Sequence, residues 1–141
     1  MSISKKITGK EKENLVAQAT KASEKAYAPY SNFRVGAAIL TAKGNVFLGC
    51  NVENVSYGLT ICAERNAVCS AVLNEGPEMK IKAIAVIVNH QASAPLCGGC
   101  RQVVSEFSMD EGINQTVVIF KNGEQLTTKT ISEILPNSFK F

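Results

Sequence analysis

Three of the five cysteines in this 141-residue chain have the spacing of ligands for one metal ion. Cys97 and Cys100 are separated by two residues, so both sulfurs can reach a single ion from one turn of chain. Cys62 can supply a third sulfur. Each segment enters an expected helix, and the amides and positive dipole at a helix N-terminus favour the thiolate form of cysteine. Because zinc binds thiolates, these three cysteines are candidate zinc ligands.

The number of candidate ligands favours a catalytic metal over a structural one. No fourth cysteine or histidine has a suitable spacing, and the only histidine, His90, follows an expected strand without a companion. A structural zinc site is normally closed by four protein ligands, whereas a catalytic site leaves one position for water. Three ligands therefore predict a zinc ion with an open position.

Glu64 is the candidate proton carrier. It lies two residues after Cys62, so at a helix start it projects at a different angle and can stand beside a metal-bound water without being a ligand. Arg65 can draw electron density off the sulfurs, as outer groups of metal sites do. A carboxylate next to an open metal position predicts metal-assisted hydrolysis.

The same residues also have simpler interpretations. A Cys-x-x-Cys pair on its own fits two core cysteines or a redox pair, and a glutamate at a helix start fits a partner of the helix dipole. The combination of both segments, with a buried strand between them, favours the catalytic zinc site. Cys50 and Cys69 stand apart from these segments and are predicted to be ordinary buried residues.

The chain around these residues alternates helices and strands. We expect helices over residues 8–27, 61–74 and 98–107, strands over 34–41, 45–51, 81–88 and 116–120, a further strand after the turn at 122–123, and a short last helix after Thr130. Thr8 with Glu11, and Thr130 with Glu133, have the spacing that caps a helix N-terminus. Strands 81–88 and 116–120 are joined through a helix and should be parallel, with a right-handed crossover. This order predicts an α/β fold, a three-layer α/β/α sandwich around a central mixed five-stranded sheet.

Composition and charge exclude several classes of protein. The length fits one domain spanning residues 1–141. A net charge of +3, scattered basic residues and the lack of tryptophan argue against a surface for a nucleic acid polymer. The longest apolar run, residues 83–88, is too short to span a bilayer, and the first six residues lack the apolar stretch of a secretory signal. With an odd number of cysteines, this predicts a cytoplasmic protein with reduced thiols.

At its two cysteine segments the sequence resembles the zinc-dependent cytidine deaminase family, in its small homotetrameric form. The similarity extends to residues 30–38 and 49–54, which look like the family's two substrate-binding stretches, and to the ending at residues 134–139. It covers about residues 13–139. One residue departs from the pattern, because Leu96 stands between Pro95 and Cys97, where the family has proline directly before the cysteine. That proline would fix the entry to the helix, so the expected turn changes and the expected ligands do not.

The resemblance implies a role for each site residue. Cys62, Cys97 and Cys100 would be the zinc ligands, Glu64 the acid and base, and Arg65 an outer group of the metal site. Asn51 and Glu53 would hydrogen-bond the ribose 3′-hydroxyl, Phe33 would flank the nucleoside, the Ala63 amide would contact the base carbonyl, and Phe139 would stack on the pyrimidine from a neighbouring subunit. The implied activity is hydrolytic deamination of free cytidine and deoxycytidine to uridine and deoxyuridine in pyrimidine salvage, by a homotetramer with shared active sites.

Three alternatives stay open at the level of sequence. A deaminase of the same chemistry could act on another small substrate, such as the nucleoside antibiotic blasticidin S. A polynucleotide-editing deaminase would need a basic, aromatic surface for the strand, which the sequence lacks. A non-catalytic zinc-stabilised binding module would need a fourth ligand and would leave Glu64 without a role.

Overall fold

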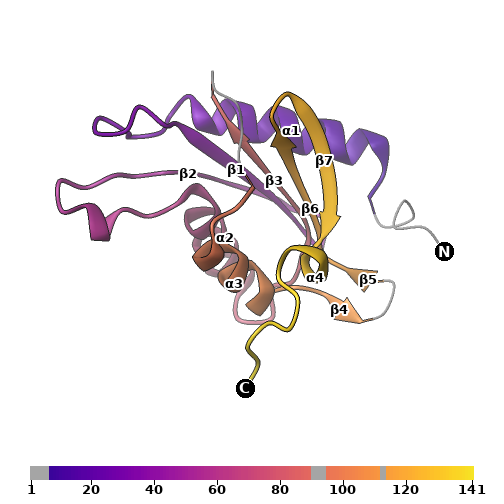
Figure 1. Ribbon diagram of the computed structural model, residues 1–141. Coiled ribbons are helices and arrows are strands. Elements are labelled where there is room, and N and C mark those ends of the chain that lie inside the picture. The colour runs from indigo at the N-terminus through magenta and orange to yellow at the C-terminus, as the bar shows by residue number, and fades with distance from the viewer. Residues whose placement is uncertain (1–6, 90–94, 112–113) are drawn as a thin grey trace.

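The computed structural model describes residues 7–89, 95–111 and 114–141, and its elements form three layers (Figure 1). A five-stranded sheet lies in the middle, with α1 across one face and α2 and α3 against the other. The helices are α1 (Gly9–Ser23), α2 (Ala63–Glu75), α3 (Gly98–Glu106) and α4 (Ile131–Ile134), with a short 3₁₀ helix η2 (Tyr57–Leu59). The strands are β1 (Val35–Thr41), β2 (Val46–Cys50), β3 (Ile81–Val88), β4 (Asp110–Glu111), β5 (Asn114–Gln115), β6 (Val117–Asn122) and β7 (Gln125–Thr130). The predicted three-layer α/β/α class is confirmed.

The central sheet has the strand order β2-β1-β3-β6-β7. Strands β3 and β6 pair in parallel, as predicted from the helix between them, and the other neighbours pair antiparallel. Both tight hairpins turn at a glycine with positive φ, Gly44 between β1 and β2 and Gly123 between β6 and β7. The sheet is therefore mixed, as expected. The small hairpin of β4 and β5 was not anticipated from the sequence.

Both expected capping boxes are present. The Thr8 hydroxyl accepts from the Glu11 amide while the Glu11 carboxylate accepts from the Thr8 amide, and Thr130 and Glu133 make the same pair of bonds at α4. Each box satisfies amide groups that the first turn of a helix leaves free. The sequence signal for these two helix starts was therefore correct to the residue.

Two helix boundaries differ from the expectation by more than one residue, and both for the same reason. Helix α1 ends at Ser23 instead of continuing to residue 27, because Tyr27 is drawn into a bridge with Val52. Helix α2 begins at Ala63 instead of residue 61, because Ile61 exchanges two backbone hydrogen bonds of 3.0 Å with Val52. In both cases a residue expected in a helix pairs instead with Val52, a loop residue, in a strand-like manner. The local sequence does not reveal this pairing.

The core lies in two layers, one on each face of the sheet. Helices α2 and α3 cover the larger cluster, which includes Ile84, Val118 and Phe120, and α1 covers a smaller one through Leu15 and Ala19. Glycine allows α1 and α2 to approach the sheet closely. A Cβ at Gly36 would overlap the backbone of α1, and a Cβ at Gly49 would meet the Ala63 carbonyl oxygen and lie 2.5 Å from the Ala67 nitrogen of α2.

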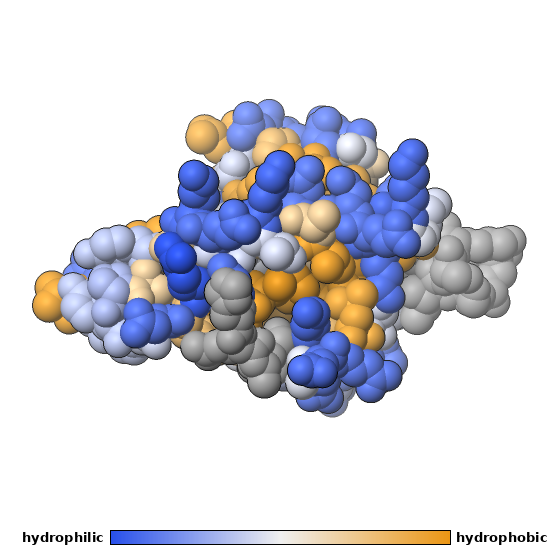
Figure 2. Space-filling model, turned by 90° about the horizontal axis from the view of Figure 1, so that it is seen from above, coloured by the Kyte–Doolittle hydropathy of each residue, from blue (hydrophilic) through white to orange (hydrophobic). Residues whose placement is uncertain are grey.

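The face of the molecule seen from above is mostly polar. Hydrophilic side chains cover most of that face, and an apolar area is exposed near its middle (Figure 2). Within the described residues, no helix combines the length and apolar character that crossing a membrane requires.

Gly49→Ala should separate α2 from β2. The added methyl group has no space between the two backbones, so we expect a loss of about 3 kcal/mol or more in the free energy of unfolding. Chemical denaturation measures the loss. Gly9→Ala is the matched control, because a Cβ there meets nothing within 4 Å and alanine is the better helix former. Equal stability of the Gly49→Ala variant and the wild-type protein would contradict the close approach.

Candidate metal centre and its cavity

Three cysteine sulfurs meet where α2 and α3 begin. The Sγ atoms of Cys62, Cys97 and Cys100 all lie within 4.8 Å of one another. Zinc–sulfur bonds of about 2.3 Å in a tetrahedron place two sulfurs about 3.8 Å apart, so the group is close to the size that zinc requires. Within the described part of the chain, these residues form the group that could hold a metal ion, and it contains no fourth ligand. His90 lies outside the described residues.

Helix N-termini hold two of these sulfurs. Cys62 is the N-cap of α2 and Cys97 the N-cap of α3, both with extended backbone, and Cys100 lies in the first turn of α3. The Cys100 amide donates to the Cys97 sulfur across 3.4 Å. The Cys62 sulfur makes no such cap hydrogen bond at α2, so the amide contact is confined to α3, while the dipoles of both helix starts favour negative charge on the sulfurs.

The pKa values of the Cys62 and Cys100 thiols are shifted in opposite directions. A hydrogen bond from Cys100 lowers the pKa of the Cys62 thiol to about 5, and Arg65 acts in the same direction. The same contact with Cys62 raises the pKa of the Cys100 thiol, as do burial and the charge of Glu64. The Cys62 thiolate thus favours the protonated form of Cys100. A divalent cation held by the three sulfurs would displace the thiol protons and stabilise all three as thiolates.

Glu64 lies directly beside the sulfurs and is not one of the ligand group. Its side chain is only 5% exposed, and burial raises the pKa of its carboxyl to about 7. The Cys62 thiolate also raises this pKa, while a hydrogen bond with Cys100 lowers it. A carboxyl with a pKa in this range can both accept and return a proton near neutral pH.

A cavity of about 480 Å³ opens above the sulfurs. Its walls include seven of the residues singled out in the sequence: Phe33, Asn51, Glu53, Cys62, Ala63, Glu64 and Cys97. Val86 and Val88 at the end of β3, together with Val35, supply apolar surface. Most of the lining is apolar with a few converging polar groups, which is typical of a site for a small organic molecule.

Asn51 and Glu53 are buried, and both already bind the backbone. The Asn51 Oδ1 accepts from the Val35 amide at 2.8 Å, and its Nδ2 donates to the Phe33 carbonyl at 2.7 Å. The Glu53 carboxylate accepts from the amides of Tyr30 and Ser31 and from the Ser31 hydroxyl. The hydrogen bond from the Ser31 side chain is the main reason that the pKa of Glu53 is lowered. These two residues hold the segment that carries Phe33 against the cavity.

Two arginines support the helix starts. The Arg65 Nη2 lies 3.7 Å from the Cys62 sulfur and 3.1 Å from the Thr60 carbonyl oxygen, so its charge is next to a candidate ligand. Arg101 was not singled out in the sequence, and its guanidinium donates to the carbonyls of Leu96 and Ile134 at 2.7 Å each. Leu96 is buried in the core, and α3 still begins at Gly98. The displaced proline therefore does not prevent the expected helix start.

Other residues differ from the expectations or were missed. Phe139 is 73% exposed and does not line the cavity of its own chain. Cys69 is exposed on α2, which corrects the prediction of a buried thiol: Ala67, Val68 and Ala71 occupy the inward face of that helix. Cys50 is half-buried. Tyr57 and Thr60 line the cavity, and the polar loop in which they lie offered no local signal for this position.

Fold and site together define an α/β zinc protein in which a buried carboxylate adjoins the metal centre at the base of a cavity for a small molecule. Residues 9–118 match the family model described as the cytidine and deoxycytidylate deaminase zinc-binding region. A cytidine deaminase from Halalkalibacterium halodurans is 42% identical over 130 residues, which cover 92% of this chain and 94% of that protein. One from Sporosarcina psychrophila is 39% identical over 127 residues, 90% of each chain.

Solved structures agree with the sequence comparison. The crystal structure of cytidine deaminase from Burkholderia pseudomallei has a TM-score of 0.77 and 43% identity, covering 90% of this chain and 98% of that one. The enzyme from Mycobacterium tuberculosis gives a TM-score of 0.78 at 37% identity, covering 93% and 98%. The chain belongs to the cytidine and deoxycytidylate deaminase family, and its metal is zinc.

Asn51→Ala should destabilise the wall of the cavity. The change leaves the Val35 amide and the Phe33 carbonyl without their partners, so we expect a loss of about 2 kcal/mol in the free energy of unfolding, measured in urea. Asn54→Ala is the matched control in the same loop. Asn54 is exposed and accepts from the Ser56 amide, so its loss should stay within about 0.5 kcal/mol. Equal losses in the two variants would contradict this role of Asn51.

Proposed function

We propose that this chain catalyses the zinc-dependent hydrolysis of free cytidine and deoxycytidine to uridine and deoxyuridine, with release of ammonia. The observation that carries the proposal is the buried Glu64 carboxyl beside three sulfurs, at the base of a cavity of nucleoside size. The relatives named as cytidine deaminases, at 39% and 42% identity over nine-tenths of the chain, support the same substrate.

The residues of this chain divide the chemistry between them. Zinc held by Cys62, Cys97 and Cys100 supplies the Lewis acidity that lowers the pKa of water at the base of the cavity. Glu64 takes a proton from the attacking water and delivers it to ring N3 while oxygen adds to C4. Glu64 then takes the proton of the new C4 hydroxyl and gives it to the amino group, so that the C4–N bond breaks, ammonia leaves and the C4 carbonyl of uridine forms. Burial of Glu64 suits both directions of transfer, because its pKa is raised to about 7.

The cavity wall recognises the nucleoside. Ala63 is the first residue of α2, where backbone amides have no partner within the helix, and its amide donates to the base carbonyl. Asn51 retains one N–H, and Glu53 retains lone pairs, for the 3′-hydroxyl of the sugar. Because both side chains are fixed by backbone bonds, they are held in place before substrate arrives. Phe33 flanks the nucleoside.

We further propose a homotetramer with shared active sites. Phe139 lies outside its own cavity and is exposed, and Val55 and Leu59 expose apolar side chains near the cavity loop at 81% and 67%. A closed symmetric assembly would cover such side chains and bring Phe139 to the pyrimidine in a neighbouring subunit.

The partners and compartment follow from the same site. The substrate is a small nucleoside, and its deamination serves pyrimidine salvage. We expect no binding to a nucleic acid polymer or to a membrane. All five cysteines are free thiols, which suits a reducing, cytoplasmic setting.

Glu64→Gln and Cys97→Ser should separate proton transfer from metal binding. Glu64→Gln should retain one zinc per chain and lose more than about 10⁴-fold in uridine formation, because one carboxylate serves successive transfers. Cys97→Ser should lose zinc affinity by more than about 100-fold, since even outer groups of a zinc site contribute 10–100-fold. Metal analysis by mass spectrometry and ultraviolet monitoring of cytidine measure both.

Controls for this pair are available in the chain. Glu13→Gln on the exposed side of α1 and Cys69→Ser on the exposed side of α2 should keep zinc and turnover. Near-native turnover by Glu64→Gln would remove that residue from its role. Failure of zinc-loaded wild-type protein to release ammonia from cytidine, with turnover of blasticidin S instead, would contradict the proposed substrate.

Phe139→Ala tests the shared site. Loss of a stacking ring should raise KM for cytidine about tenfold while zinc content is unchanged. Subunits of Phe139→Ala and of inactive Glu64→Gln are then mixed after reversible dissociation. If Phe139 acts in a neighbouring subunit, hybrids contain sites with an intact Glu64 and an intact Phe139, and low-KM activity returns. Mixing without such recovery, or a fully active monomer in light scattering, would contradict the shared site.

A further inference from the structure

Arg101 connects two segments that are distant in sequence. It lies in the first turn and a half of α3, immediately after Cys100, and is half-buried. Its Nε donates to the Leu96 carbonyl and its Nη1 to the Ile134 carbonyl, each at 2.7 Å. Hydrogen bonds from a charged guanidinium are stronger than neutral ones, and partial burial reduces competition from water.

The bond to Leu96 acts on a candidate zinc ligand. The Leu96 carbonyl belongs to the peptide unit that joins Leu96 to Cys97, so fixing this oxygen fixes the backbone from which the Cys97 sulfur projects. Cys97 is exposed and lies before the helix, whereas Cys100 is buried within it. Cys97 therefore has less support from the helix than Cys100 has, and the hydrogen bond from Arg101 adds to it.

The bond to Ile134 acts on the C-terminal segment. Ile134 is the last residue of α4, where helix carbonyls have no partner within the helix, and the chain leaves this point toward Phe139. The neighbour of Arg101 on α3, Gln102, makes a second and longer contact to the Phe139 carbonyl, at 3.4 Å. Two consecutive residues of α3 thus hold the beginning and the end of this segment.

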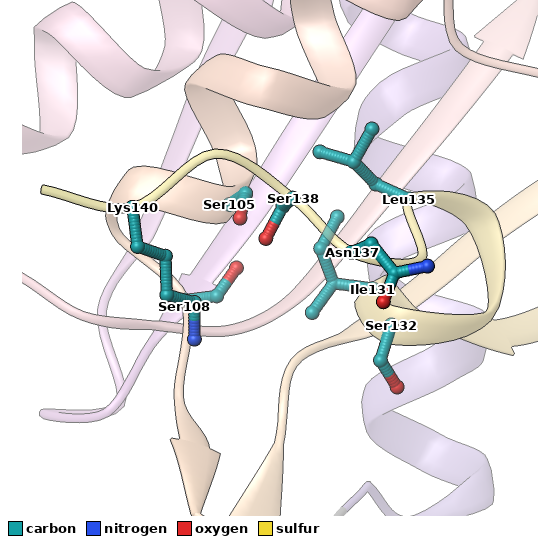
Figure 3. A pocket seen from close by; sticks show the side chains of 8 residues that line it. All are labelled: Ser105, Ser108, Ile131, Ser132, Leu135, Asn137, Ser138 and Lys140. Atoms are coloured by element: carbon teal, nitrogen blue, oxygen red, sulfur yellow. The ribbon is translucent and has the colours of Figure 1, made fainter.

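The C-terminal segment leaves a cavity where it crosses α3. Figure 3 shows the chain after α4 passing over α3, with side chains such as Ser105 and Ser138 between them. A cavity of about 210 Å³ lies there, and serines make up half of its lining residues. Because small polar side chains line much of this gap, the hydrogen bonds of Arg101 and Gln102 add directional contacts that help to set the path of the segment.

Arg65 makes a comparable connection at the other helix. It lies three residues after Cys62 and returns to the Thr60 carbonyl in the loop that enters α2, as Arg101 returns to Leu96 in the loop that enters α3. The difference is that Arg65 also approaches a sulfur, at 3.7 Å, and the hydrogen bonds of Arg101 go to carbonyl oxygens. Arg65 therefore affects both the charge of a sulfur and the position of its loop, whereas Arg101 affects the position of the backbone that it binds.

We propose that Arg101 is a positioning residue of the active site, which holds Cys97 in the zinc-binding group and sets the path of the C-terminal segment that carries Phe139. The second half rests on the proposed function, in which Phe139 contacts the nucleoside. The first half depends only on zinc.

The experiment compares Arg101→Ala and Arg101→Lys with wild-type holoenzyme at a temperature well below unfolding. Transfer of zinc to a coloured chelator should be about tenfold faster for Arg101→Ala, the size of effect that outer groups of zinc sites have. KM for cytidine should rise more than kcat falls. Arg101→Lys should be intermediate in both, because an ammonium can reach one carbonyl but cannot span two as a planar guanidinium does.

Three further variants separate positioning from general stability. Val104→Ala removes buried methyl groups from the same helix and should lower the melting temperature without faster zinc release. Gln102→Ala should raise KM only. Arg65→Ala, next to the Cys62 sulfur, should release zinc faster than wild type and gives the scale for an arginine that also carries charge to the site.

The proposal is overturned if Arg101→Ala releases zinc at the wild-type rate, or no faster than Val104→Ala with an equal loss of melting temperature. If Arg101→Ala does not yield folded protein, Arg101→Lys decides by the same criterion. Absence of cytidine turnover in the wild-type protein would count against the proposed function and the role of Arg101 in substrate binding. The zinc-release comparison would still decide its role at Cys97.

Discussion

The whole arrangement depends on holding three cysteine sulfurs within 4.8 Å of one another, although they come from the starts of two separate helices. A hydrogen bond between Cys62 and Cys100 lowers the pKa of the first thiol and raises that of the second, and three thiolates at this separation would experience strong mutual repulsion. The sheet overcomes it by fixing both helices to the same face. Gly49 is part of that device, because only a residue without a side chain lets α2 lie this close to β2. A divalent cation then turns a repulsive group into a stable one.

Local signals predicted most of the elements and missed boundaries that distant contacts determine. The capping boxes at Thr8 and Thr130 need only residues three apart, and the parallel pairing of β3 and β6 follows from the helix between them. The predicted C-terminal end of α1 and the predicted start of α2 were wrong because Val52 pairs with Tyr27 on one side and with Ile61 on the other. Neither pairing can be predicted from the residues around Tyr27 or Ile61, because the partner, Val52, lies outside those stretches of sequence.

The same limit divides the candidate site. The sulfurs and Glu64 could be found because their spacing along the chain is itself the chemical signal, and the structure brings them together. For Asn51 and Glu53, sequence suggested contacts to a sugar, while the structure shows side chains already bonded to the backbone of residues 30–35. Both side chains therefore stabilise the wall of the cavity, through partners about twenty residues away in the sequence. Arg101 escaped notice for the same reason, since its acceptors lie on segments that only the fold places beside it.

Arg65 and Arg101 lie near the starts of α2 and α3, and both bind the loop that enters their helix. Each guanidinium donates to a carbonyl oxygen of the loop that enters its helix, to Thr60 from Arg65 and to Leu96 from Arg101. Arginine has several donors in one rigid plane and remains charged at any pH at which the protein folds, so it can join two carbonyls, or a carbonyl and a sulfur, without changing state. A lysine ammonium is more compact and more strongly hydrated, so it would reach only one of the two acceptors and would lose less of its hydration shell. A zinc site on two helix N-termini therefore needs outer groups that bind oxygen on the loops and tolerate thiolate charge, and the guanidinium meets both requirements.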